Sequence, residues 1–381
     1  MLLITNEDIQ GMLKRNDLDL AEVNRRIERT YQDLGHGRAV YSPKHQISAP
    51  LPSQFHRDGF LDETFKVGTL QGLVESSGYF ALRMKLDIQY RLATTHEKYC
   101  IEPGMFCGLV LLVDLRNAEP IALMNDGLIQ HLRVGATDAV AADYMARRDA
   151  EVLGIYGSGG MARSHAQTIA CVRKLRKIKV YSPTRDHRET FAAEMEEELG
   201  IEVRAVETPE ELPLDCDIIA ECTDAIIPVL TDRCVMSGVH ITGSGGHFTP
   251  GAMDRLDAVV LHQAVSGSTV FNYTTGPQGA EMGGGMRFRG GKIGANGDVE
   301  PSVHIPDDER ARHPGVRGTL AEMVTGVFPG REGEREANYF FNDCGTGIQF
   351  ATIAGQVYET ARALGDVHEI PTDLLTQTIR D

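Results

Sequence analysis

The sequence predicts an α/β protein in which a Rossmann-type parallel sheet is joined to a second, mixed α+β domain. From residue 151 to residue 261, short apolar runs alternate with helical stretches, which is typical of βαβ units around a parallel sheet. Before residue 128, strand-like runs follow one another with turn residues between them, beside one clearly helical stretch. This second pattern favours a mixed sheet packed on a helix.

Composition limits the classes of function. The chain has 381 residues, enough for two domains, and 42% of them are hydrophobic, as in globular proteins. A formal net charge of -16 argues against nucleic acid or an anionic membrane as the main partner. The sequence contains neither a signal-peptide pattern nor a run of about 18 apolar residues, so we expect no membrane span.

Cysteine usage favours a cytoplasmic protein without a metal centre. The seven cysteines are scattered, odd in number and without any Cys-x-x-Cys spacing. We therefore expect neither a disulfide framework nor a metal site. Isolated thiols suit a reducing compartment.

Helical spacing of apolar residues predicts a helix from Ala21 to Leu34, and Asn6 is a candidate cap for an earlier helix. Glycine and proline then divide residues 35–52 into short extended pieces. The strands predicted after them are Tyr79 to Ile88, Met105 to Val113 and Ile121 to Met124.

A long helix, predicted from Ile129 to Arg148, leads into the alternating part of the chain. Residues 276–297 are rich in glycine and lose all periodicity, so they form either a surface excursion or a lid over a site. The predicted strands are 151–156, 178–181, 203–206, 218–221, 239–242 and 259–261, and the predicted helices are 162–174, 188–199, 319–327 and 349–364.

A glycine-rich turn follows the first of these strands and opens the next helix, which is the setting of a dinucleotide-binding turn. Gly157 permits the tight turn, Gly159 lets the backbone approach a pyrophosphate, and Ala162 still allows close helix packing. The free amides of the helix start would face the phosphates. The residues assigned to the cofactor here are Gly157, Ser158, Gly159, Gly160, Met161 and Ala162.

The end of the second strand bears on the choice between NAD and NADP. Enzymes that use NAD usually carry an acidic residue there, which binds the ribose hydroxyls. This sequence has Ser182, Thr184 and Arg185 instead, and an arginine fork suits a 2′-phosphate. NADP(H) is therefore favoured, while NAD(H) stays possible if Arg185 is only solvated.

Two further turns follow short strands at the edge of the sheet where open α/β sheets bind ligands. They contain Cys222 and Thr223, and Gly243 and Ser244. We assign these residues to the cofactor site, and ordinary strand-to-helix turns are the alternative.

Several motifs together resemble the ornithine cyclodeaminase/mu-crystallin family. The most specific is Leu132-Arg133-Val134-Gly135-Ala136-Thr137, followed by a helix and the glycine turn. Lys85-Leu86 closes an early strand, and the resemblance covers about residues 1–265 and 316–370. The late pieces that fit are Thr319 to Gly326, Pro329-Gly-Arg331 and Gly345-Thr-Gly347.

The resemblance implies a homodimer of two-domain chains. Residues 1–128 and 345–381 would form the substrate and dimerisation domain. Residues 129–344 would form the dinucleotide-binding domain, with a glycine-rich insertion at about 270–315 that is not part of the family pattern.

The resemblance also assigns roles to individual residues. Arg133 would hold a substrate carboxylate in the fork of its guanidinium, unless it only pairs with Asp138 or Asp143. Lys85 would lie beside the substrate and manage a proton. Arg83 lies on the same side of the strand and is the alternative for that role.

Two departures from the family change these expectations. Cyclodeaminases carry an aspartate after a Gly-Gly pair, where this chain has His247, a different acid–base group. The family also has an arginine after a proline in the first domain, where Lys44 and His45 follow Pro43 here. We keep Lys44 and His45 as substrate-binding candidates, with Arg38 as a fallback.

The leading hypothesis is therefore an NAD(P)H-dependent imine or keto-acid reductase, or the reverse amino-acid dehydrogenase. Its partners would be small imines, keto acids or amino acids, with Lys85, Arg133 and His247 as catalytic residues. A cyclodeaminase that recycles its NAD is the second hypothesis, and His247 argues against it. A non-catalytic binder like mu-crystallin is the third, and the presence of Lys85 and Arg133 argues against that.

Overall fold

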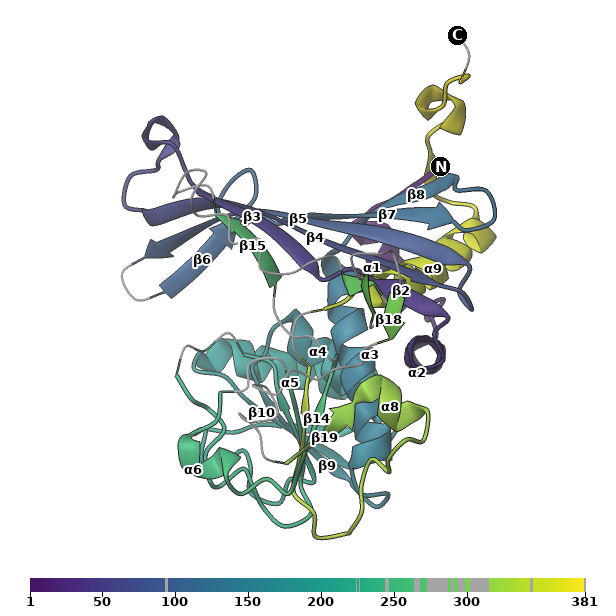
Figure 1. The fold of residues 1–381 in the computed structure, drawn as a ribbon. Helices are drawn as coiled ribbons and strands as arrows, with labels where there is room; N and C mark the ends of the chain where they lie inside the picture. The colour runs from purple at the N-terminus through teal and green to yellow at the C-terminus, as the bar shows by residue number, and fades with distance from the viewer. Residues whose placement is uncertain are drawn as a thin grey trace.

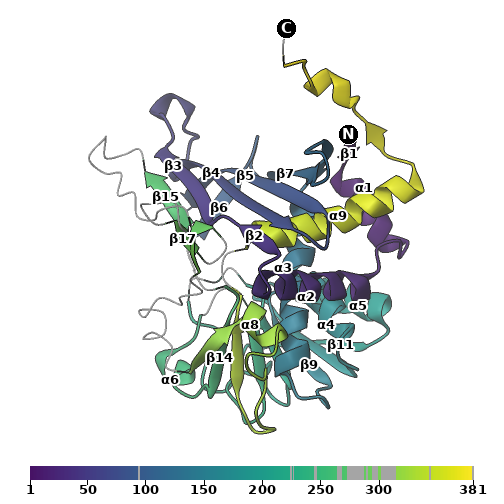
Figure 2. The same cartoon turned by 45° about the vertical axis from the view of Figure 1, so that its right-hand side comes forward.

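In the computed structural model, a large mixed sheet lies above a smaller parallel sheet, and a long helix connects them (Figures 1 and 2). Both termini lie beside the mixed sheet, where the first and last strands pair with each other. The structure describes residues 1–92, 95–223, 225, 227–243, 247–263, 268–272, 287–288, 291–293, 299–301, 315–342 and 345–379.

The mixed sheet is built on two long antiparallel strands, β4 (Leu61–Val74) and β5 (Tyr79–Leu92), with 14 residues each. Their side chains alternate between an inner face that packs on helices and an outer face that stays half-buried. The other described strands of this sheet are β1 (Leu2–Ile4), β2 (Ala39–Tyr41), β3 (Lys44–Pro50), β6 (Thr95–Tyr99), β7 (Cys107–Asp114), β8 (Pro120–Asn125), β15 (Ser268–Asn272) and β21 (His368–Glu369).

Helices cover the inner face of this sheet, with α9 (Gly347–Leu364) crossing below β4 and β5 (Figure 2). The crossing is so close that a Cβ atom on Gly72 would lie 2.2 Å from the Ile348 nitrogen, so only glycine fits there. The remaining elements of this part are α1 (Asn6–Lys14), α2 (Leu20–Gly35), and the 3-10 turns η1 (Ser53–Phe55) and η3 (Thr372–Leu375).

The lower sheet confirms the predicted Rossmann-like class, because its eight described strands are all parallel. Its strand order is β11-β10-β9-β12-β13-β20-β14-β19, which reverses direction between β9 and β12. The strands are β9 (Val152–Tyr156), β10 (Lys177–Tyr181), β11 (Glu202–Ala205), β12 (Ile218–Glu221), β13 (His240–Gly243), β14 (Ala258–Leu261), β19 (Val316–Thr319) and β20 (Asn338–Phe341).

Helix α3 (Gly127–Met145) joins the two sheets and packs on α4 (Gly160–Ala170). A Cβ atom on Gly135 would lie 2.7 Å from the Ser164 carbonyl oxygen, so the motif glycine is needed for this contact. The other described helices are α5 (Arg185–Leu199), α6 (Pro250–Met253) and α8 (Leu320–Val324).

Several sequence-based boundaries need correction. Thr5, not Asn6, caps the first helix, because the Thr5 side chain accepts from the Asp8 amide and Asp8 accepts in return. The strand β4 was not expected, and β15, from the edge of the predicted insertion, pairs with β3 in the mixed sheet. The rest of the insertion lies mostly outside the described residues, apart from a small sheet of β16 (Arg287–Phe288), β17 (Gly291–Ile293) and β18 (Val299–Pro301).

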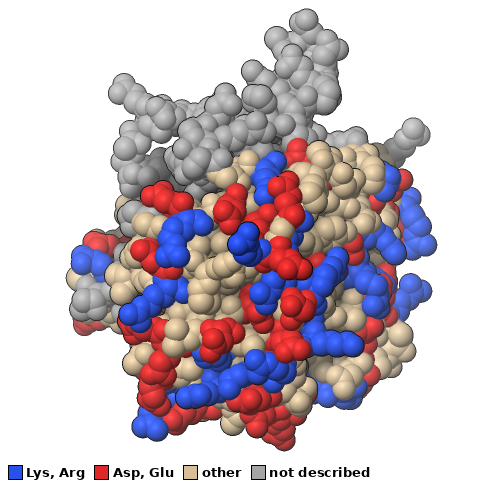
Figure 3. Space-filling view, turned by 90° about the horizontal axis from the view of Figure 1, so that it is seen from below, with Lys and Arg blue, Asp and Glu red and all other residues tan. Residues whose placement is uncertain are grey.

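The lower surface of the parallel-sheet domain carries acidic and basic side chains that are interspersed (Figure 3). None of the described helices is long and apolar enough to span a bilayer. Among the described residues, no cluster of three or more histidine, cysteine or acidic side chains is arranged to hold a metal ion.

Candidate functional site

A cavity of about 420 Å³ lies at the carboxyl edge of the parallel sheet, where the strand order reverses between β9 and β12. This position is where open α/β sheets bind their ligands. It is lined by residues from α3, the glycine turn, the end of β10 and the end of β12. These are His131, Val134, Gly157, Ser158, Gly159, Gly160, Met161, His165, Ser182, Pro183, Thr184, His187, Glu221, Cys222 and Thr223.

The glycine turn follows a backbone path that leaves no room for side chains at Gly157 and Gly160. Gly157 has φ 108°, and a Cβ atom there would lie 2.3 Å from the Cys222 carbonyl oxygen. Helix α4 begins at Gly160, whose Cβ would meet the His131 ring at 2.3 Å. The chain thus brings the backbone amides of a helix start to the cavity wall, which fits a bound dinucleotide. Ala162 packs in the core instead of lining the cavity.

Hydroxyl groups line the end of the cavity next to β10. Ser158 donates to the Ser182 hydroxyl at 2.9 Å, and Thr184 is the next polar residue along the wall. Arg185 is not a lining residue, because its side chain is 68% exposed and pairs with Glu189. His187, which sequence reasoning did not select, lines the cavity here.

A buried ion pair lies below the turn. His165 Nδ1 donates to the Met161 carbonyl oxygen at 2.7 Å, and His165 Nε2 bonds Asp138, whose other oxygen accepts from Asn342 at 2.9 Å. Burial opposes the charged form of His165, but the adjacent Cys222 and Asp138 side chains raise its pKa well above the ordinary value. This pair ties α3 to α4.

A second buried acid lies at the end of β12. The Glu221 side chain is fully buried, and its Oε1 lies 2.5 Å from His247 Nδ1. Gly243, on the neighbouring strand, leaves room for Glu221 and does not itself line the cavity. Ser244 lies outside the described residues.

Arg133 lies on the same turn of α3 as His131 and Val134, and its side chain points toward α9. Its guanidinium donates to the Gln130 and Gln349 amide oxygens at 3.4 Å and lies 5.8 Å from the Phe350 ring centre. The alternative partners weighed from the sequence are engaged elsewhere, Asp138 with His165 and Asp143 with Arg148 and Arg173. Arg133 therefore lies between the cavity and the mixed sheet.

The basic residues of the mixed sheet divide into two groups. Arg83 is buried in an ion pair with Asp126 at 2.6 Å, which gives it a structural partner. Lys85, two residues along the same face, keeps a side chain that is 21% exposed and lies 2.5 Å from Asp87. The fallback residue Arg38 is exposed and pairs with the buried Asp33.

The two substrate-binding candidates on β3, Lys44 and His45, lie on opposite faces of the sheet. Gln46 pairs with Gly68, which pairs with Lys85, so Lys44 lies on the face of Lys85. The Lys44 side chain passes over Gly68, where a Cβ atom would lie 3.3 Å from it. His45 pairs with Thr69 on the outer face, so we leave His45 out of the site.

Four titratable cavity residues were missed by sequence reasoning, namely His131, His165, His187 and Glu221. A signal was available for two of them. His131 stands two residues before Arg133 in the most specific motif, and Glu221 ends an otherwise apolar strand, Ile-Ile-Ala-Glu. His165 depends on helix packing and has no comparable signal.

The comparisons agree with this geometry. The family model of the ornithine cyclodeaminase/mu-crystallin family matches residues 96–365. The delta(1)-pyrroline-2-carboxylate reductase of Bacillus cereus is 27% identical over 259 residues, which cover 68% of this chain and 72% of that protein.

Solved structures match along nearly the whole chain. The delta(1)-pyrroline-2-carboxylate reductase of Thermococcus litoralis, in complex with NADH and L-proline, superposes with a TM-score of 0.69 at 25% identity. The match covers 97% of this chain and 100% of that one. An archaeal alanine dehydrogenase dimer with bound NAD has a TM-score of 0.67 at 19% identity, over 97% of this chain and 98% of that chain. The chain therefore belongs to the ornithine cyclodeaminase/mu-crystallin family.

Proposed function

We propose that this protein is an NAD(P)H-dependent reductase of small imines that carry a carboxylate, or the reverse amino-acid-type dehydrogenase. The observation that carries the proposal is the position of Arg133, where the cavity meets the part of the molecule that holds Lys85. The cavity is lined by the turn of α3 that holds Arg133, and Arg133 contacts Gln349 and Phe350 of α9, the helix that packs on the strand of Lys85. Its relatives include reductases of a cyclic imino acid.

The roles of the residues follow from their chemistry. The Arg133 guanidinium would bind the substrate carboxylate in two places and fix its orientation. Lys85 would place an ammonium beside the reacting carbon–nitrogen bond, and Asp87 would balance its charge. A bound nicotinamide dinucleotide supplies or accepts the hydride. His247, which pairs with the lining residue Glu221, would be the acid–base group.

NADP(H) is the cofactor we favour over NAD(H). The described wall next to β10 offers Ser182, Thr184 and His187, which can donate to a 2′-phosphate, and no carboxylate that would repel it. Arg185 would have to leave Glu189 to help, and an exposed ion pair is easily exchanged. Ser182→Asp should reverse the preference, because its carboxylate would bind ribose hydroxyls and repel the phosphate.

We also propose a homodimer that buries the outer face of the mixed sheet. Register places apolar side chains side by side across four strands of this face, including Ile47, Val67, Leu82, Met84, Leu109 and Leu111. An exposed apolar surface of this extent usually marks an interface. Leu82→Glu should give a single chain by light scattering, whereas Leu214→Glu, exposed in the other domain, should leave a dimer.

The reaction is tested by the oxidation of NADPH and NADH with cyclic imino acids, and with 2-oxo acids plus amines. We expect turnover with at least one cyclic imino acid and the amino acid as product. Oxidation at the background rate with every candidate would contradict the proposal. Ammonia release from ornithine or lysine without net change in cofactor would establish the cyclodeaminase alternative.

A further inference from the structure

The carboxylate of Glu221 is buried at the end of an apolar strand, where a charged group is energetically unfavourable unless it is compensated. It ends β12 beside the cavity, its side chain has no exposed surface, and the rest of the strand is apolar. A buried carboxylate is stable only when its charge is compensated by hydrogen bonds or an opposite charge. His247 Nδ1, 2.5 Å away, provides such a bond.

Backbone contacts fix the positions of both Glu221 and His247. The His247 carbonyl oxygen accepts from the amides of Val229 and Leu230, each at 3.0 Å, and Phe248 forms a bridge with Leu230. Opposite Glu221 on β13 is Gly243, with φ 154°, where a Cβ atom would lie 2.6 Å from Glu221 Cβ. The strand pair is therefore shaped around the glutamate side chain.

This geometry determines which ring nitrogen carries a proton. An ionised carboxylate only accepts hydrogen bonds, so Nδ1 of His247 must be the donor. Nε2 is then the nitrogen that can exchange a proton with a ligand, in the same way that a buried acid orients the histidine of a hydrolase triad. His247 is not itself a lining residue of the cavity, but its side chain is 31% exposed and pairs with Glu221, which lines it.

We propose that Glu221 and His247 form a dyad in which His247 exchanges a proton with the substrate nitrogen and Glu221 is the positioning residue. This inference rests on the proposed function. In the reductive direction, the imidazolium gives its Nε2 proton to the imine nitrogen, and the hydride of the reduced nicotinamide adds to the imine carbon. The C=N double bond becomes a single bond, and His247 regains a proton from solvent. In the reverse direction, Nε2 takes the proton.

A double-mutant cycle tests whether Glu221 acts through His247. We expect His247→Asn to lower kcat about 100-fold, and Glu221→Gln to lower it about 10-fold or more. The double variant should be within about threefold of His247→Asn, because the glutamate has no role without the imidazole. The matched control Glu202→Gln removes an exposed carboxylate at the far edge of the sheet and should leave kcat unchanged.

The dinucleotide affinity of each variant distinguishes a positioning role of Glu221 from a role in cofactor binding, and the double variant distinguishes it from an independent role in catalysis. We expect the Kd of NADPH and NADH, measured by nicotinamide fluorescence, to change less than about threefold in Glu221→Gln. A tenfold weaker Kd would make Glu221 a cofactor-binding residue instead. Additive losses of kcat in the double variant would also overturn the dyad, because the two side chains would then act independently.

A readout without turnover keeps this inference distinct from the proposed function. In ligand-free protein labelled with ¹⁵N-histidine, the signals missing in His247→Asn belong to His247. We expect Nδ1 to be protonated in the natural protein, and Glu221→Ala to remove that preference. An active reductase with His247 protonated on Nε2 alone overturns the dyad. A protein with the expected tautomer that reduces no imine overturns the proposed function, and the catalytic role with it.

Discussion

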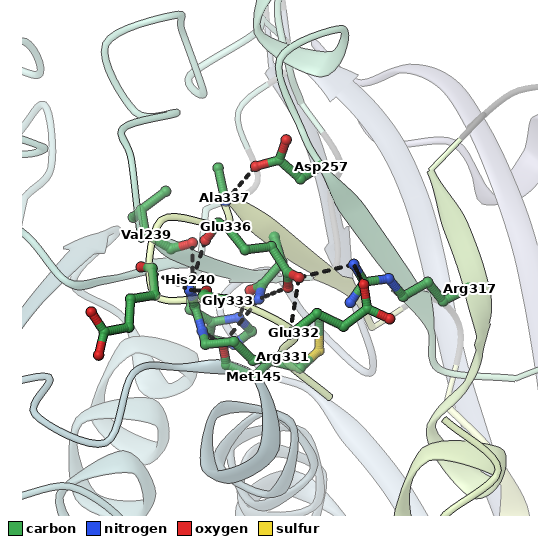
Figure 4. Close-up of polar contacts among 12 residues, drawn as sticks. Met145, Val239, His240, Asp257, Arg317, Arg331, Glu332, Gly333, Glu336 and Ala337 are labelled. Atoms are coloured by element: carbon green, nitrogen blue, oxygen red, sulfur yellow. Dashed lines mark hydrogen bonds and ion pairs between the residues drawn. The ribbon is translucent and has the colours of Figure 1, made fainter. Parts of the chain in front are cut away.

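Both ends of the parallel sheet bury polar side chains, but these side chains meet different partners. At the amino end, the partners are mostly backbone groups of the fold (Figure 4). Arg331 donates to the carbonyl oxygens of Met145, Gly238 and Glu336 at 2.6 to 3.1 Å, and His240 donates to Asn338 at 2.8 Å. These contacts join the end of α3 to β13 and β20.

At the carboxyl end, side chains instead pair with each other beside a cavity. Glu221 meets His247, and Asp138 meets His165, which lines the cavity wall. Burial of a charged group therefore does not by itself indicate function in this molecule. The nature of the partner, together with an adjoining cavity, separates the end that stabilises the fold from the end that we propose for the chemistry.

The largest effect is expected at the amino end. Arg331→Ala should lower the free energy of unfolding by about 4 kcal/mol, because several buried carbonyl oxygens lose their donor. Arg331→Lys should lower the free energy of unfolding by about half as much, because an ammonium cannot reach several carbonyl oxygens in the way that a forked guanidinium does. Chemical denaturation measures both. The exposed neighbour Arg335 is the control, and a loss no larger than that of Arg335→Ala would show that the network is dispensable.

Arg133→Ala should change catalysis, whereas Arg331→Ala changes the stability of the fold. We expect kcat/KM for the imine to fall about 10²–10³-fold, as the carboxylate loses a two-point charged contact. The Kd of the dinucleotide should change less than threefold, or about 0.6 kcal/mol. Arg148→Ala, with an exposed side chain three residues after the end of the same helix, is the control. If Arg133→Ala loses no more kcat/KM than this control, Arg133 is not part of the site.

Two buried histidines should respond to pH in opposite ways. Burial lowers the pKa of His240 to about 3, so the folded state resists its protonation, whereas His165 has a raised pKa. As pH falls below about 6.5, the unfolded state binds a proton at His240 that the folded state does not, and stability is lost. The stability contributed by protonated His165 is complete below about 6.5 and is lost as pH rises toward its folded pKa.

The unfolding free energy between pH 5 and pH 9 measures both effects. Relative to His240→Asn, the natural protein should lose on the order of 2 kcal/mol as pH falls from 7 to 5. Relative to His165→Asn, it should lose stability as pH rises. The same direction in both comparisons would contradict the assigned charge states.

The fold could be predicted from sequence where the determining pattern is local. The strand β12 was placed at its observed bounds, because a strand buried on both faces is a continuous apolar run. The strand β4 was not found, since Lys66, Gly68 and Gln71 interrupt its apolar pattern, and Gly72 is required by the distant helix α9. Tertiary contacts, and not local preference, determine these positions.

The same distinction holds for the candidate site. The turn from Gly157 to Met161, which the spacing assigns to a cofactor, lines the cavity, and its position could be found from sequence because its geometry is local. Glu221 and His247 are 26 residues apart, and the pairing of β12 with β13, together with the bonds of His247 to Val229 and Leu230, brings them together. His45 was expected beside Lys44, but adjacent residues of a strand point to opposite faces.

The smallest effect is expected at Arg185, on the rim of the cavity. Arg185→Ala should weaken NADPH by no more than about fivefold, because the exposed guanidinium already pairs with Glu189 and is screened by solvent. NADH should be unaffected, since it has no 2′-phosphate, and Glu189→Gln should strengthen NADPH slightly by releasing the arginine. Titrations at low and high salt measure these differences, which should shrink as salt rises. Equal weakening of both cofactors would remove Arg185 from phosphate recognition and leave Ser182, Thr184 and His187 to carry it.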